Sequence, residues 1–352
     1  MRTVPGLVSA AVLALLLTGC VSHEQRAADI AAELENLPGV ISVSSNGNDR
    51  GIVNSAGQGV RVDVDPTIDP VDAAAIVEKW IEVGGSDDSS SGFTMSAEST
   101  LAPEVPLGDH GIYLEHAGLD EAQALAAASL WATLLPANDE VIVRLEGDDK
   151  WFSVTTSRAV DTPSITALAG ELDGVVPPGL RDLHWTIGAS LNRTDQLRGV
   201  TLSTNSGLPD AELLAFVDRL DPALTLASFG GGYQLSIADN AGSGFDRDPA
   251  YSIDVTLDPD DLRDVPSNQT FELIPNTSSW TSAQAFAGAL RVDDDVELTL
   301  TLFNGRAFAE LDTDSCERSV DPDNSPYGAD LWAHWLRFGG MSADGSTATA
   351  CA

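Results

Sequence analysis

Apolar residues recur along this chain at two spacings that alternate from segment to segment. Over residues 27–37 they are spaced as on one face of a helix, and Pro38-Gly39 ends that segment. Over residues 60–64 valines alternate with polar residues, as in a strand with one buried face. The pattern predicts short helices and strands in succession along the chain.

The expected elements follow one order, namely helix, two strands, helix and strand, in four successive passes. The first helices of the passes begin near residues 27, 119, 209 and 282, so the period is roughly 70–90 residues. In the third pass the loop 238–249 replaces the second helix. Helices are predicted at 27–37, from 69 onward, and at 119–135, 163–172, 209–220, 282–290 and 327–338. Strands are predicted at 40–43, 60–64, 93–97, 112–115, 141–145, 151–155, 184–187, 200–203, 224–229, 233–237, 251–257, 270–274, 296–303 and 307–311.

This order predicts an α+β fold of repeated ferredoxin-like (α-β-β-α-β) units, with antiparallel sheets covered by helices on one face. The predicted units are 27–105, 106–195, 196–266 and 267–352. The helix, the Pro38-Gly39-Val40 stop and the paired strands of the first unit resemble a BON module, an envelope-associated α/β domain. That resemblance covers residues 25–98 and rests on element order, so it assigns no binding residue.

The first residues have the features of a bacterial secretory signal. Arg2 supplies a positive start, and an apolar run extends from Leu7 to Leu17. The run is shorter than the about 20 apolar residues of a membrane-spanning helix. Leu17-Thr18-Gly19-Cys20 resembles a lipobox, which implies a lipoprotein cleaved before Cys20 and carrying a diacylglyceryl group on that thiol.

The lipoprotein resemblance implies a location as well as a modification. Residues 1–19 would be the signal peptide, and 20–26 a tether to the first helix. Two acyl chains on Cys20 are about what stable attachment to a bilayer requires. We therefore expect the chain on the extracytoplasmic side of the cell membrane. Its preference for Arg over Lys and its many alanines are typical of a high-GC genome, such as that of an actinobacterium.

The chain is strongly acidic, with 54 Asp and Glu against 18 Lys and Arg and a formal net charge of −36. Nucleic-acid binding needs a basic face, and here the basic residues are scattered singly. The composition therefore excludes nucleic acid as a partner and favours an unknown envelope protein or a small solute.

Three cysteines are present, and lipidation of Cys20 would leave Cys316 and Cys351. Outside the cytoplasm two such thiols normally pair, so a Cys316–Cys351 disulfide is predicted. It would tie the polar tail to the last hairpin and stabilise the fold by roughly 3–4 kcal/mol in the chain-entropy model.

No metal or cofactor motif is present. The histidines share no metal-ligand spacing, and we expect them to be ordinary exposed residues: His23, His110, His116, His184 and His334. Carboxylates cluster at 63–72, 258–261, 293–295 and 312–323 without the Ca²⁺-loop spacing, and most suit helix or turn starts. No cofactor is predicted. A weak Ca²⁺ site would form where the oxygens are densest, around Asp312, Asp314, Asp321 and Asp323.

The sequence also lacks the motifs of nucleophilic catalysis, including Gly-x-Ser-x-Gly and Ser-x-x-Lys. No enzyme activity is expected. Among the tryptophans, Trp80, Trp131, Trp332 and Trp335 fall on predicted amphipathic helices and are expected in the core. Trp151 and Trp185 fall on predicted strands, where an exposed sheet face would be the first surface to search for a partner.

Three functions stay open at this point. The leading interpretation is a membrane-anchored lipoprotein that acts as a non-catalytic binding or structural module at the cell envelope. A second is a solute- or cation-binding lipoprotein with an interdomain cleft. A third is an envelope hydrolase that uses an unrecognised carboxylate pair.

Overall fold

The computed structural model describes most of the chain after the N-terminal segment. The described residues are 23–47, 58–85, 92–98, 110–115, 118–138, 140–147, 150–157, 161–189, 198–226, 231–241, 249–259, 262, 272–302, 307–313 and 327–338. Within these ranges no helix combines the length and the apolar character needed to cross a membrane.

All of the named strands belong to one sheet of 12 strands, and their order in the sheet is their order in the chain. The strands are β1 Val40–Gly47, β2 Gln58–Val64, β3 Gly92–Ala97, β4 His110–Glu115, β5 Val141–Glu146, β6 Trp151–Thr156, β7 His184–Ala189, β8 Arg198–Thr204, β9 Gly231–Asp239, β10 Tyr251–Pro259, β11 Val296–Leu302 and β12 Ala307–Asp312. Neighbouring pairs alternate along the sheet: β1 and β2 are antiparallel, β2 and β3 parallel, β3 and β4 antiparallel, and so on to β12.

Each parallel pair is joined through a helix, and helices also lie at the two ends. They are α2 His23–Leu34, α3 Pro70–Trp80, α4 Glu121–Leu134, α5 Thr162–Val175, α6 Ala211–Leu226, α8 Ser278–Ala287 and α9 Gly328–Phe338. Short π or 3₁₀ turns complete the list: η1 Ile81–Gly85, η2 Leu135–Ala137, η3 Pro178–Leu180, η5 Ile274–Asn276 and η6 Val292–Asp294. The repeating unit is thus one helix followed by two strands, roughly 50 residues long.

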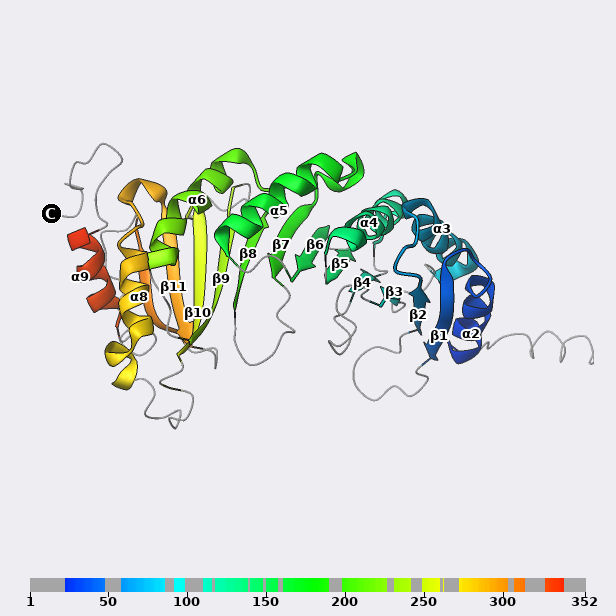
Figure 1. Ribbon diagram of the computed structural model, residues 1–352, viewed down its shortest axis with the longest axis horizontal. Helices are drawn as coiled ribbons and strands as arrows, with labels where there is room; N and C mark the ends of the chain where they lie inside the picture. The colour runs from blue at the N-terminus through cyan, green and yellow to red at the C-terminus, as the bar shows by residue number, and fades with distance from the viewer. Residues whose placement is uncertain are drawn as a thin grey trace, which may run out of the picture.

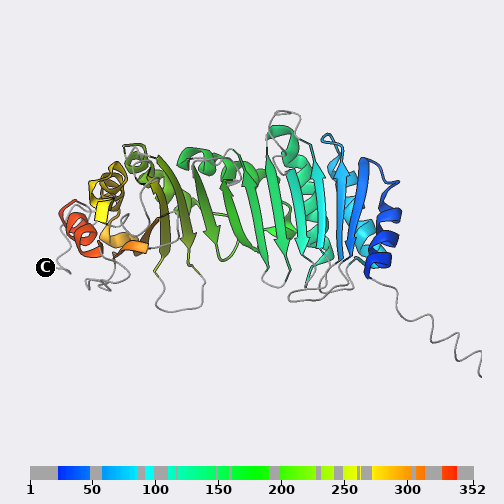
Figure 2. The same ribbon diagram turned by 90° about the horizontal axis from the view of Figure 1, so that it is seen from below.

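The described helices all pack against one face of the sheet (Figures 1 and 2). The sheet is curved, with the helices on the outer, convex side and the strands on the inner, concave side (Figure 1). A large apolar core lies between helices and sheet; its largest fully buried side chains include Trp80, Trp131, Trp185 and Trp335. Arrays of stacked units create extended concave surfaces of this kind.

The helix starts repeat one local device, an aspartate that caps the first turn. The carboxylates of Asp69, Asp120 and Asp161 accept hydrogen bonds from the backbone N–H groups of Val71, Gln123 and Ser164, respectively. Such a cap satisfies a backbone donor that has no partner inside the helix. The predicted helix start at Asp69-Pro70 is confirmed.

The α+β character of the chain is confirmed, but ferredoxin-like packing is not. In a split βαβ arrangement, another strand separates the two strands that flank a helix. Here the two strands that flank each helix are direct neighbours, so the sheet mixes parallel and antiparallel pairs. Each predicted pass of five elements corresponds to about two helix-strand-strand units, which explains the overestimated period.

The sheet continues across the predicted unit boundaries. Strands β3 and β4 pair across residue 105, β7 and β8 across 195, and β10 and β11 across 266. Two predicted strands are wrong where the chain is described. Residues 224–226 continue α6 beyond Pro222, and 274–276 form the turn η5, where Pro275 favours a helical φ.

Candidate functional site

The concave face of the sheet is lined by rows of side chains, most of them polar, that run across the strands. The strand register gives the first row as Ser44, Arg61, Thr94, Tyr113, Arg144, Ser153, Thr186, Ser203, Ala238, Ser252, Glu297 and Asp312. The second row is Ser42, Asp63, Ser96, Gly111, Ile142, Thr155, Gly188, Thr201, Ser236, Asp254, Thr299 and Glu310. Both rows cross all 12 strands of the sheet.

The rows arise from the two-residue period of a strand. Successive side chains point to opposite faces, so the positions between the buried apolar residues all reach the concave face. On β11, for example, Leu298 and Leu300 are buried whereas Glu297 is exposed and Thr299 and Thr301 are half-buried. Threonine suits such positions because its branched side chain favours extended backbone while its hydroxyl faces solvent.

The middle of the concave face forms a neutral patch, which we define as the described concave-face residues of β6 to β9. Within this definition the patch contains no Asp, Glu, Lys or Arg. Its polar and aromatic members are Trp151, Ser153, Thr155, His184, Thr186, Thr201, Ser203, Gln234 and Ser236. In a chain of net charge −36, an uncharged stretch four strands wide is a distinct surface.

A chain of hydrogen bonds crosses the neutral patch. The indole Nε1–H of Trp151 on β6 donates to Thr186 Oγ1 on β7 over 3.0 Å. Thr186 Oγ1 in turn lies 3.1 Å from Ser203 Oγ on β8. The indole therefore reaches sideways over the neighbouring strand, and its half-buried ring forms part of the concave surface.

The flanks of the neutral patch are charged. Toward the N-terminal end, the Arg144 guanidinium lies 5.1 Å from the centroid of the Tyr113 ring, a cation–π contact. Toward the C-terminal end, the concave face carries Asp254, Glu297, Glu310 and Asp312. Burial raises the pKa of Asp254 above its ordinary value.

The carboxylates grouped at residues 63–72 have separate local roles in the fold. Asp69 caps α3, Asp65 accepts hydrogen bonds from the backbone and hydroxyl of Thr67, and Asp63 lies in the second row. Across the described residues no group of three or more His, Cys, Asp or Glu side chains is placed to hold a metal ion. Of the weak Ca²⁺ candidates, Asp312 ends β12, while Asp314, Asp321 and Asp323 lie outside the described residues.

Asp63 gives the concave face a testable pH dependence. Burial raises the pKa of Asp63, but hydrogen bonds from Ser96, Ser42 and Arg61 outweigh it and leave the pKa below its ordinary value. A lowered pKa in the folded state adds stability above pH of about 4, which is lost as the pH falls through the folded pKa. We expect Ser96→Ala to destabilise the fold at pH 7 and to have a smaller effect at pH 3, as measured by urea unfolding at both values.

Ser44→Ala is the matched control for this prediction, since Ser44 lies in the other row on the edge strand. Its effect should be small and equal at the two pH values. An effect of Ser96→Ala that does not change with pH would rule out the coupling to Asp63.

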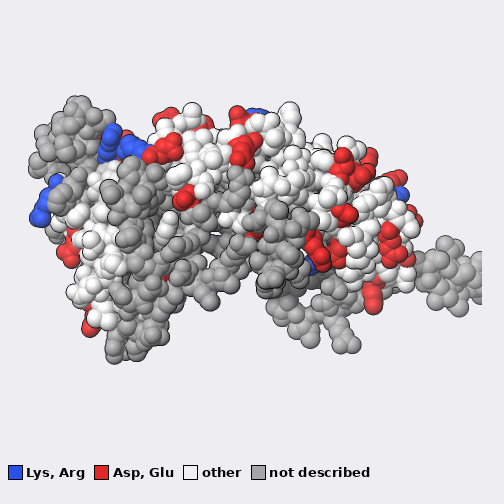
Figure 3. Space-filling model, in the orientation of Figure 1, with Lys and Arg blue, Asp and Glu red and all other residues white. Residues whose placement is uncertain are grey.

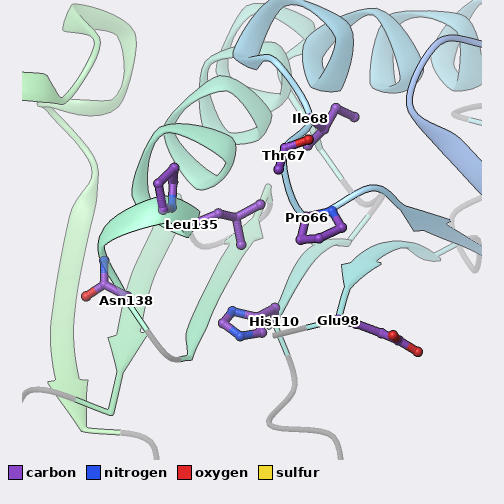
Figure 4. Close-up of a pocket in the computed structure, with 8 residues that line it drawn as sticks. Pro66, Thr67, Ile68, Glu98, His110, Leu135 and Asn138 are labelled. Carbon is purple, nitrogen blue, oxygen red and sulfur yellow. The ribbon is translucent and has the colours of Figure 1, made fainter. Parts of the chain in front are cut away.

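A small pocket lies at one end of the strands, beside the starts of β4 and β5 (Figure 4). Its volume is about 260 Å³, and its lining residues are Pro66, Thr67, Ile68, Glu98, His110, Leu135, Pro136 and Asn138. The Glu98 side chain points away from His110 (Figure 4). His110 is 3% exposed, contrary to the expectation of an exposed residue, because its Nδ1 accepts the backbone N–H of Val141 over 3.2 Å.

The polar groups of this pocket serve the ends of the surrounding elements. The His110 ring accepts the backbone N–H at the start of β5. The Asn138 amide donates to the carbonyl of Leu134 at the end of α4. A second, more open hollow of about 630 Å³ lies between α2 and α3, where Lys79 pairs with Glu82 over 3.1 Å. Charged side chains line this second hollow, and Lys79 Nζ also lies 3.8 Å from Glu33 Oε2 of α2.

The remaining sequence-based expectations divide into three groups. Trp80, Trp131 and Trp335 are buried as expected, and Trp332 packs partly buried against the core. Of the two strand tryptophans, Trp151 lies half-buried on the concave face, whereas Trp185 is buried between the sheet and the helices. The lipobox with Cys20, and Cys316, Cys351 and His116, lie outside the described residues, so the anchor and the disulfide stay predictions.

Sequence reasoning missed the two rows and the neutral patch. The available signal was the hydroxyl residues at every second position of the apolar strands, which appear in Thr-x-Ser and Ser-x-Thr patterns on β3, β6 and β8 and as Thr-x-Thr on β11. Acidic side chains, in contrast, are spread over the visible side of the molecule (Figure 3). No protein-family model, no curated protein and no solved structure matches this chain.

Proposed function

We propose that this chain is a non-catalytic binding module that is held at the extracytoplasmic side of the membrane by a lipid on Cys20. The concave face of the sheet is the proposed binding surface. The observation that carries the proposal is the predominantly polar face that extends across 12 strands, on the side of the sheet opposite the described helices (Figure 2). A single sheet gives such a surface a fixed shape, which reduces the entropy lost on binding.

The hydrogen bonds of the concave face are those of a polar surface. The hydroxyls of Thr186 and Ser203 hydrogen-bond to each other, and Thr186 also accepts the indole N–H of Trp151. The exposed large apolar side chains of the described residues, Ile41, Val71, Val175 and Leu273, lie on separate segments. The proposed ligand is therefore recognised by polar contacts.

The anchor part of the proposal is tested by acylation of the full chain in an actinobacterial host. We expect wild-type protein to incorporate labelled palmitate and to begin at Cys20, as read by mass spectrometry of its N-terminal peptide. Cys20→Ser should incorporate no label, because the thiol is the acylated group. Cys316→Ser is the control and should be labelled normally. Wild-type protein without label, or cleaved elsewhere, would contradict the anchor.

The binding-surface part is tested by blocking the concave face. Thr201→Arg places a long charged side chain in the second row, and Thr281→Arg makes the same change at an exposed position on α8. The full chain in detergent is sedimented with isolated, membrane-free cell walls of the host. We expect Thr201→Arg to lower the bound fraction at least tenfold and Thr281→Arg to leave it unchanged. Equal binding by both variants would overturn the proposed surface.

A further inference from the structure

We propose that the neutral patch binds an uncharged glycan chain, with the Trp151 indole as its stacking platform. This inference rests on the proposed function and names the ligand class of the same surface. It is carried by three independent features of the patch, which are the orientation of Trp151, the absence of charge and the spacing of the rows.

Trp151 is oriented to offer a ring face. Its Nε1 bonds to Thr186, which lies on the adjacent strand diagonally across from it, since Trp151 pairs with His184 and Ser153 with Thr186. This hydrogen bond ties the half-buried indole to the concave surface of the neighbouring strand β7. The C–H face of a pyranose ring packs against such an aromatic face, and its hydroxyls then reach the polar side chains around the ring.

The surroundings of Trp151 suit a neutral ligand with many hydroxyls. Side chains such as Thr155, Thr201, Ser236 and Gln234 can each donate or accept a hydrogen bond. Covering them with a polyol exchanges hydrogen bonds with water for equivalent ones, and a ligand confined to the neutral patch leaves in water the carboxylates that border it, Glu146 opposite Trp151 and Asp254 opposite Ser236. A polyanion would be repelled by the net charge of −36, and a cationic partner would find carboxylates on both borders of the patch rather than within it.

The spacing of the rows also fits a glycan better than a peptide. Each row advances one strand at a time, by about 4.8 Å. The repeat of one sugar unit in an extended glycan is close to this distance, whereas an extended peptide repeats its side-chain pattern every about 6.6 Å. Gly188 keeps the floor of the second row low, because a Cβ at this position would lie 2.8 Å from Thr201 Oγ1. A chain laid across the strands would therefore advance by about one strand per unit, past hydroxyl groups at Thr155, Thr201 and Ser236 of the second row.

The test is titration of the full chain, in a detergent without a sugar headgroup, by isothermal calorimetry. The probes are the hexamers of glucose and of N-acetylglucosamine, both β-1,4-linked, and a hexalysine and a hexaglutamate peptide. We expect saturable binding of at least one glycan and none of the peptides. Trp151→Ala should weaken glycan binding at least tenfold, and Thr186→Val, which removes the acceptor of the indole N–H, should weaken it several-fold.

Controls separate this inference from the proposed function. Thr281→Arg, at an exposed position on α8 away from the concave face, should leave glycan affinity within twofold. Circular dichroism checks that each variant is folded. Binding of a peptide alone, or glycan binding that is indifferent to Trp151, would overturn the glycan inference. Cell-wall sedimentation that still depends on Thr201, without binding of either glycan, would overturn the ligand class while leaving the proposed binding surface intact.

Discussion

Replacing Trp185 with alanine is expected to destabilise the protein by about 3–5 kcal/mol, as is usual for the loss of a buried aromatic side chain. Trp185 on β7 is 1% exposed and packs edge-on against Phe152, with ring centroids 4.6 Å apart. Its Nε1–H also donates to the carbonyl of Leu180 over 2.8 Å. The variant would lose the contact with Phe152 and would leave the buried Leu180 carbonyl without its hydrogen-bond donor, which further lowers the free energy of unfolding.

The measurement is urea unfolding followed by circular dichroism. Trp151→Ala is the matched control, because Trp151 lies on the neighbouring strand but on the concave face, and it should cost less than half as much. Since β7 is in the middle of one continuous sheet, we expect a single shifted transition. Two separate transitions in Trp185→Ala would show instead that parts of the array unfold independently. A loss below about 1 kcal/mol would contradict the buried position of this indole.

The second large effect is expected at the ion pair between α6 and the turn before β11. Arg219 makes two hydrogen bonds to Asp294, Nη1 to Oδ2 over 2.9 Å and Nη2 to Oδ1 over 2.5 Å. Its guanidinium also lies 5.2 Å from the Phe216 ring, and Phe216 stacks on Tyr251 with centroids 4.2 Å apart. The pair thereby fixes α6 to the strands β10 and β11.

We expect Arg219→Ala to cost about 2–3 kcal/mol of unfolding free energy. The Asp294 side chain is 9% exposed, so it would be left as a largely buried charge, but the 27% exposure of Arg219 places the cost below that of a fully buried pair. Arg219→Lys should cost about half as much, because an ammonium cannot form the two parallel bonds. Arg181→Ala is the control, since its pair with Asp173 is exposed and should contribute less than about 1 kcal/mol.

A double-mutant cycle with Asp294→Asn isolates the interaction itself. A coupling energy above about 1 kcal/mol between positions 219 and 294 is expected. A value near zero would mean that Arg219 acts through its contact with Phe216. It would contradict the prediction that the Arg219–Asp294 ion pair fixes α6 to the turn before β11.

The sequence by itself determined which segments are helices and strands and which of their faces are buried. Those properties are local, since periodicity and caps such as Asp69 and Asp120 operate within a few residues. The prediction was wrong after Pro222, where a strand was expected. There α6 continues instead, because tertiary packing can outweigh a single residue that disfavours a helix. The anchor at Cys20 and the Cys316–Cys351 pair also come from sequence alone and stay predictions.

Only the tertiary structure decided how the strands join. The same helix-strand-strand pattern is compatible with separate sheets or with one, because periodicity states which face is buried but not which strand is the neighbour. The strand register then decides which side chains lie next to one another on the surface. For example, 35 positions separate Trp151 from Thr186 and 17 separate Thr186 from Ser203, and the three meet only because β6, β7 and β8 are neighbours in the sheet. The concave face, and with it the neutral patch, exists because residues with polar side chains at alternate positions were brought into common rows by pairing across the whole sheet.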